Sequence, residues 1–106
     1  MTTSTAMPSQ AFLLTKIGQE FLLADEAGNS TTVVLQSVGD GVPMDDTYTC
    51  YRMVVLCQPG VQAAQATYQL STQDQSWFIF MSPTNPEKNG QVRLQASFHY
   101  PVSEIA

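Results

Sequence analysis

The chain has 106 residues, which suffices for one domain with a single hydrophobic core. Hydrophobic residues make up 43% and charged residues only 12%, so we expect a polar but weakly charged surface. The net charge is −5, and the four basic residues form no basic stripe that would bind nucleic acid through its phosphates: Lys16, Arg52, Lys88 and Arg93.

The N-terminal segment has neither the basic start nor the apolar run of a secretory signal. No stretch approaches the roughly 18 apolar residues that a membrane helix requires. We therefore expect a protein made in the cytoplasm without a signal peptide or membrane contact, and open to incorporation in a virion-like or extracellular assembly. The predicted organisation is a flexible arm over residues 1–9, a single β domain over 10–101 and a C-terminal tail over 102–106.

The first predicted element is a short helix over residues 10–17. Ser9 is suited to cap its N-terminus, and Gly18 to end it in a left-handed conformation. The run is barely two turns long.

Six runs rich in β-branched and aromatic residues follow, each closed by turn residues, and they predict β-strands. In chain order they cover residues 20–25, 31–38, 48–57, 67–71, 77–81 and 91–100. The first two form a hairpin across Ala27-Gly28-Asn29, where the glycosylation sequon at Asn29 is interpreted as turn chemistry. Trp77 to Met81 are apolar on both faces, which predicts a central strand covered from two sides.

Together these elements predict an all-β fold: a small antiparallel barrel or sandwich of about six strands with one short N-terminal helix plugging an end. The barrel and the open sandwich remain alternatives, because strand order cannot be read from one sequence.

The two cysteines, Cys50 and Cys57, lie in one predicted strand. They would be on the order of 20 Å apart with side chains on opposite faces, so we expect two reduced thiols and no disulfide between them. With a single histidine and no Cys-x-x-Cys pair, a zinc site is not expected. The acids of the loop after residue 38 lack the spacing of a calcium loop, so no metal or cofactor is predicted: Asp40, Asp45 and Asp46.

No constellation for catalysis is recognisable. The only histidine, His99, falls on the polar side of the last strand, and the acid pairs Asp25-Glu26 and Asp45-Asp46 lie in turns, where solvation should leave their pKa values near normal. We predict that the protein is not an enzyme and assign no catalytic, cofactor-binding or metal-binding residue.

Most aromatic residues fall on strand positions that a core must fill. Tyr48 and Tyr51, at the margin of the loop from Gly39 to Thr47, are the least committed to the core. An alternative function is therefore a small ligand- or glycan-binding β module, with one of these rings as a stacking platform at the loop or the barrel mouth.

Four segments carry a family resemblance that runs from about residue 11 to residue 100: residues 17–21, residues 58–59 with 66–70, residues 78–83 and residues 96–98. They resemble a family of short bacterial proteins of unknown function, often encoded beside phage-tail-collar proteins of the microcystin-dependent type. The resemblance implies no catalytic residue. With the β pattern, it leads us to expect a non-enzymatic structural or assembly component of a phage-tail-like or fibre-like apparatus. Its partners would be proteins, either itself or neighbouring tail or fibre proteins.

Overall fold

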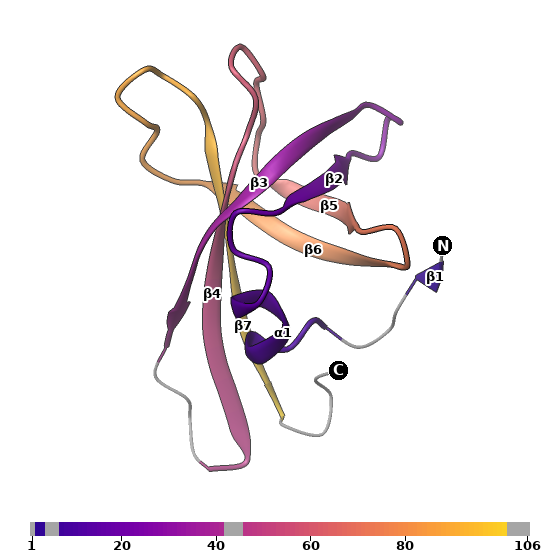
Figure 1. The fold of residues 1–106 in the computed structure, drawn as a ribbon, viewed down its shortest axis with the longest axis vertical. Helices are drawn as coiled ribbons and strands as arrows, with labels where there is room; N and C mark the ends of the chain where they lie inside the picture. Colours follow the sequence, from indigo (N-terminus) through magenta and orange to yellow (C-terminus); the bar gives the residue numbers. More distant parts are fainter. Residues whose placement is uncertain (1, 4–6, 42–45, 102–106) are drawn as a thin grey trace.

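The structure, a computed structural model, describes residues 2–3, 7–41 and 46–101. Figure 1 shows one short helix, α1 (Gln10–Leu14), and a set of strands that wrap around a common core. The strands are β1 (Thr2–Thr3), β2 (Glu20–Ala24), β3 (Ser30–Asp40), β4 (Tyr48–Leu56), β5 (Ala66–Ser71), β6 (Gln75–Pro83) and β7 (Arg93–Pro101).

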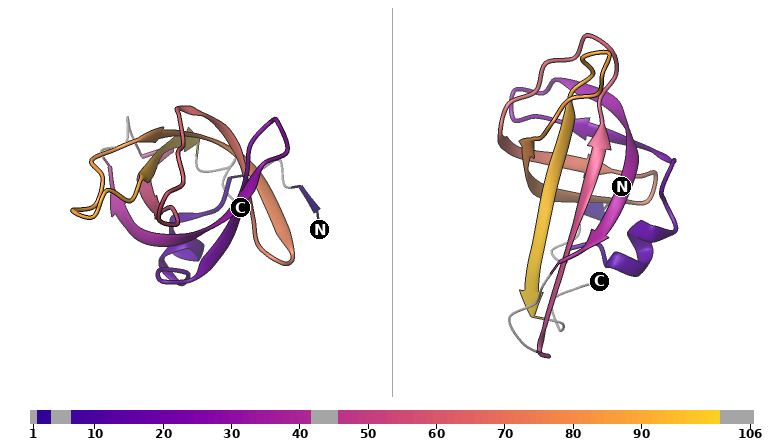
Figure 2. Two further views of the ribbon diagram at one scale, coloured as in Figure 1. Left: turned by 90° about the horizontal axis from the view of Figure 1, so that it is seen from above. Right: turned by 90° about the vertical axis from the view of Figure 1, so that its left-hand side faces the viewer.

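Strands β2 to β7 close into an antiparallel barrel, in which neighbours follow the order β2, β3, β4, β7, β6, β5 and back to β2. This confirms the predicted all-β fold and identifies the barrel as the correct alternative. The seams differ greatly in length: β4 pairs with β7 from Tyr48 to Leu56, whereas β6 pairs with β7 only at Ser82 and Pro83. The two views of Figure 2 show the ring of strands from above and the long β4 and β7 side by side.

The core consists of the side chains that alternate inward along these strands. On β4 the buried positions are Tyr51, Met53 and Val55, each at most 1% exposed. On β7 the buried positions are Leu94, Ala96 and Phe98, as the alternation in the sequence predicts.

Helix α1 is shorter than the predicted 10–17. Ser9 caps it as expected, since its Oγ accepts from the Phe12 amide at 3.1 Å. After the helix the chain makes a 3₁₀-type turn, in which both the amide and the hydroxyl of Thr15 donate to the Phe12 carbonyl three residues earlier. Gly18 follows with φ +87°, the left-handed conformation predicted for it, and turns the chain toward β2.

Helix α1 covers the core between β3 and β6. Leu13 is fully buried, and the Phe12 ring lies 5.7 Å from the ring of Trp77 on β6. The residues just before the helix belong to the same packing, because the Tyr51 hydroxyl on β4 donates to the Pro8 carbonyl. The segment from Met7 to Leu13 is thus part of the folded domain.

Strand β3 contains a bulge, which shifts its register with β4 between Leu35 and Ser37. Beside it, the Leu35 carbonyl accepts from the Gly18 amide at 2.8 Å, and the Leu35 amide donates to the Gln19 carbonyl at 3.1 Å. The turn after α1 is therefore attached to β3 by two backbone hydrogen bonds.

The prediction that Trp77 to Met81 is covered from two sides is wrong. Trp77, Ile79 and Met81 point into the barrel, but Phe78 and Phe80 are 54% and 55% exposed. The reason is geometric: a closed barrel offers each strand one inner and one outer face, and no second layer covers the outer face of β6 in the described part of the chain.

Strand β1 was not predicted; it pairs in parallel with β6 at Gln75 and Ser76.

Among the described residues, no helix has the length and apolar character needed to cross a membrane.

Candidate functional site

A hollow on the surface of the barrel has a volume of about 720 Å³. It lies between the β2–β3 turn, the connection that leads from β4 to β5, and the start of β5. Its volume falls within the range of ~300–1,000 Å³ that is usual for small-ligand sites. We call it the turn pocket, and its lining is Leu23, Asp25, Glu26, Ala27, Asn29, Ser30, Thr31, Val61, Gln62, Ala63, Ala64, Ala66, Thr67 and Tyr68.

The floor of the turn pocket is apolar and firmly held. Leu23 on β2 and Tyr68 on β5 are 3% and 7% exposed, so both belong to the barrel core. The Tyr68 hydroxyl donates to the Ala64 carbonyl, which attaches the small-residue wall of the pocket to its floor. Burial raises the pKa of Tyr68, so this phenol stays neutral and remains a donor.

The rim of the turn pocket is acidic. Asp25 accepts from the Asn29 amide at 2.9 Å and from the Asn29 side chain at 3.2 Å. These hydrogen bonds, the side-chain one first, lower the pKa of Asp25, so the sequence-based expectation of a near-normal pKa is wrong for this carboxyl group. Glu26 follows it on the same turn, and the rim therefore presents two carboxylates.

A second surface lies on the outer face of β6. Phe78 and Phe80 are two residues apart and point outward together, opposite Gln69 and Thr67 of β5. We call these two rings the phenylalanine pair. Phe80 also borders a hollow of about 320 Å³ where β6 and β7 diverge, whose lining is entirely uncharged: Ile79, Phe80, Ser82, Pro83, Thr84, Gln95 and Ser97.

The structure separates the two tyrosines that the sequence presents as candidate stacking platforms. Tyr51 is 1% exposed and its ring stacks on Phe98 at 4.7 Å, so it cannot receive a ligand from solution. The prediction that Tyr51 is among the aromatic residues least committed to the core is wrong. Tyr48 is half-buried, with its ring 5.2 Å from the imidazole of His99.

The remaining candidate residues do not converge on one centre. His99 is exposed on β7 opposite Cys50 of β4, and Cys57 is buried, which raises its pKa and keeps its thiol protonated. Asp40 accepts from Gln10 at 2.6 Å, while Asp45 lies outside the described residues. Over the described ranges, no group of three His, Cys, Asp or Glu is placed to hold a metal ion.

Neither of the two surfaces was identified from the sequence. The acids of the turn pocket were recognised only as turn residues, and its wall comes from the connection at Val61 to Ala64, whose place in space depends on strand order. The phenylalanine pair did leave a signal, because β6 is apolar on both faces. In the sequence that signal is interpreted as a strand covered on both faces, whereas the structure leaves its outer face exposed.

A family model described as Domain of unknown function (DUF6916) matches residues 9–98. No curated protein and no solved structure matches the chain.

Proposed function

Since the chain belongs to the DUF6916 family, whose description assigns no activity, we propose from its geometry that it is a non-enzymatic assembly component that acts through protein–protein contacts. The observation that carries this proposal is the phenylalanine pair. Burying a phenylalanine side chain is worth about 1.5–3 kcal/mol, so two half-exposed rings side by side are a costly feature for a small domain to keep on its surface.

The surroundings of the phenylalanine pair support a protein contact. The residues opposite it on β5 are Gln69 and Thr67, and the hollow beside Phe80 has no charged residue in its lining. The cores of protein interfaces are enriched in aromatic residues and depleted of charge. The phenylalanine pair and the uncharged residues around it therefore have the composition of the core of a protein interface.

We propose a second copy of this chain as the occupant. Each copy carries a net charge of −5, so two copies repel each other unless they meet through an uncharged face. The outer face of β6 meets that condition. A contact between two copies through the same surface is also the commonest form of self-association.

The apparatus in which we place these contacts is phage-tail-like or fibre-like. This part of the proposal is supported by the resemblance of residues 17–21, 66–70 and 78–83 to short bacterial proteins often encoded beside phage-tail-collar proteins. In that setting a neighbouring tail or fibre protein is the second partner to test.

The experiment is light scattering across a concentration series, together with co-purification with the products of neighbouring genes. The wild type should self-associate, and the double variant Phe78→Ser/Phe80→Ser should weaken association at least about tenfold, the usual effect of removing aromatic anchors. Leu14→Ser is the matched control, since Leu14 is also apolar and 50% exposed but lies on α1. A strict monomer that binds no neighbouring product would contradict the proposal.

A second candidate function is a small ligand- or glycan-binding module, which the volume and apolar floor of the turn pocket favour. Tyr48 is the remaining candidate platform for the glycan version, because Tyr51 is buried. Ligand-observed NMR and a glycan array test this function, and an absence of binding in both would contradict it.

A further inference from the structure

We propose that the turn pocket binds a ligand that combines a small apolar body with one positive charge, such as an organic amine. The inference rests on the second candidate function above and adds to it the chemical class of the ligand. Three properties of the pocket carry it: its apolar floor, its acidic rim and the absence of basic side chains from its lining.

The floor selects an apolar body. Leu23 and the Tyr68 ring are held in the core, and the facing wall is built from Val61, Ala63 and Ala64. Because the Tyr68 hydroxyl already donates to the Ala64 carbonyl, Tyr68 lines the pocket without an unpaired donor. An apolar group of about phenyl size gains burial there without leaving that hydroxyl unpaired.

The rim selects a positive charge. Asp25 is held in place by the amide and the side chain of Asn29 at 2.9 and 3.2 Å, with smaller contributions from the amides of Ala27 and Gly28, and its carboxylate lies on the exposed edge of the pocket, where a charged group can approach it. Glu26 adds a second carboxylate to the same turn. An ammonium group at this rim makes charge-assisted hydrogen bonds, which are stronger than neutral ones.

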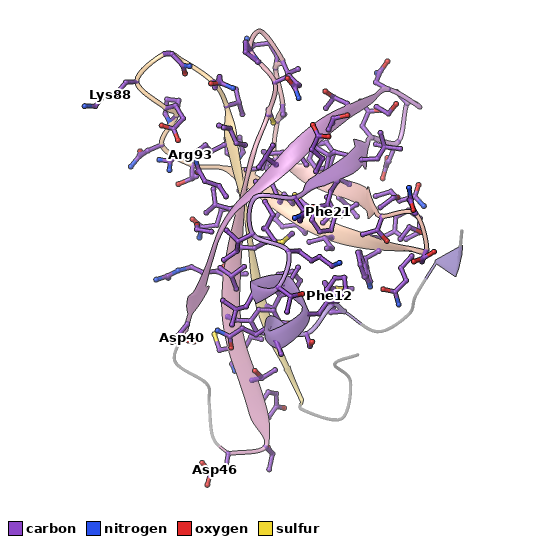
Figure 3. All side chains as sticks on the ribbon, viewed as in Figure 1. Phe12, Phe21, Asp40, Asp46, Lys88 and Arg93 are labelled. Carbon is purple, nitrogen blue, oxygen red and sulfur yellow. The ribbon has the colours of Figure 1, made fainter. Side chains whose placement is uncertain are left out.

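No basic residue of the chain competes for these carboxylates within the pocket. The sequence contains four Lys or Arg residues and one His, and none of them contributes to the pocket lining. Lys88 and Arg93 lie on the other side of the molecule from the β2–β3 turn, as Figures 1 and 3 show together. The two acids on the rim are therefore available to a charge supplied from outside.

The test is an amide-resolved NMR titration with three probes of nearly equal size: 2-phenylethylammonium, neutral 2-phenylethanol and anionic 3-phenylpropionate. We expect the cation to shift the amides of Thr31, Ala63 and Thr67 and to bind about tenfold more tightly than the alcohol, with the anion weakest. A blocked peptide, acetyl-Leu-Lys-amide, distinguishes the two sources of this chemistry. Tighter binding of the peptide points to a lysine of a protein partner, and tighter binding of the amine points to a free small molecule; either result supports the inference.

Two variants test which carboxylates of the rim bind the cation. Asp25→Asn and Glu26→Gln should each reduce the affinity for the cation about threefold while leaving the affinity for the alcohol unchanged. Asp74→Asn, which removes an acid from the β5–β6 turn outside the pocket, is the matched control and should change neither. Glu26→Gln keeps the test valid if Asp25→Asn perturbs the turn, because the pairing with Asn29 involves Asp25 alone.

Two results would overturn the inference in distinguishable ways. If the neutral or the anionic probe binds as tightly as the cation, the charge class is wrong but the ligand-binding function stands. If no probe binds at millimolar concentration, the pocket is not a site for small ligands and both fail.

Discussion

At the scale of single residues, Asp25 shows how a turn changes the chemistry of one side chain. The sequence places Asp25 in a solvated turn and predicts an ordinary pKa. The fold adds two donors from Asn29, four positions later, and these stabilise the carboxylate. The pKa is lowered as a result. The pairing was not predicted because it depends on how the turn closes, and Asp and Asn occur in turns of several types.

The variant Asn29→Ala tests this coupling. It removes the side-chain donor and keeps the backbone donor, so the pKa of Asp25 should rise toward its ordinary value without reaching it. A carboxyl-detected NMR titration measures this shift. Asn89→Ala, in the turn before β7, is the control and should leave the pKa of Asp25 unchanged; an equal shift in both variants would contradict the assignment.

The sign of the accompanying effect on stability follows from the direction of the shift. Because folding lowers the pKa of Asp25, its contribution is present above the unfolded value of about 4 and is lost as the pH falls through the folded value. As the pH falls from the unfolded pKa of Asp25 to the folded one, the free energy of unfolding should decrease more in the wild type than in Asn29→Ala. The reason is that folding lowers this pKa further in the wild type than in the variant.

At the scale of elements, the sequence predicts which segments form strands better than it predicts what packs against each segment. The six strands are all present, because alternation and turn residues are local signals. The extent of α1 and the exposure of β6 depend on what packs against them, which one sequence does not show. The apolar pattern of Trp77 to Met81 is the same whether the strand has one face exposed in a barrel wall or both faces covered, so the pattern does not distinguish the two.

The two leucines that end helix α1 give a matched pair for testing its role. Leu13 is fully buried and Leu14 is 50% exposed. Leu13→Ala should lower the free energy of unfolding by about 2–5 kcal/mol, the usual cost of a buried cavity. Leu14→Ala should change it by less than about 0.5 kcal/mol.

Urea denaturation measures both leucine variants. Equal losses in the two would show that α1 does not pack against the barrel as described.

At the scale of the whole molecule, strand order decides where the two candidate surfaces lie. The connection after β4 leads to β5, which pairs with β2, and this brings Ala63 beside the turn that carries Asp25. Such neighbours are distant in the sequence and are fixed by the closed topology. This is why the fold class could be predicted and the candidate sites could not.

The uneven seams of the barrel predict uneven protection of backbone amides. The Thr84 amide donates to the Arg93 carbonyl at 2.9 Å beside the short β6–β7 seam. It should exchange through a lower-energy opening than the amides of β4, which pairs with β7 along its whole length. Hydrogen exchange followed by NMR measures this difference, and equal protection would mean that the barrel opens only as a unit.

Trp77 is the only tryptophan in the sequence and is 1% exposed, and its indole nitrogen has no hydrogen-bond partner in the described part of the chain. An indole in such a dry environment emits at short wavelength, and its emission moves to longer wavelength when water reaches it. Because the Phe12 ring of α1 lies against it, undocking of the helix and melting of the barrel wall both alter the same signal. The chain thus carries its own optical probe, and loss of its structure can be followed by light emission without an attached dye.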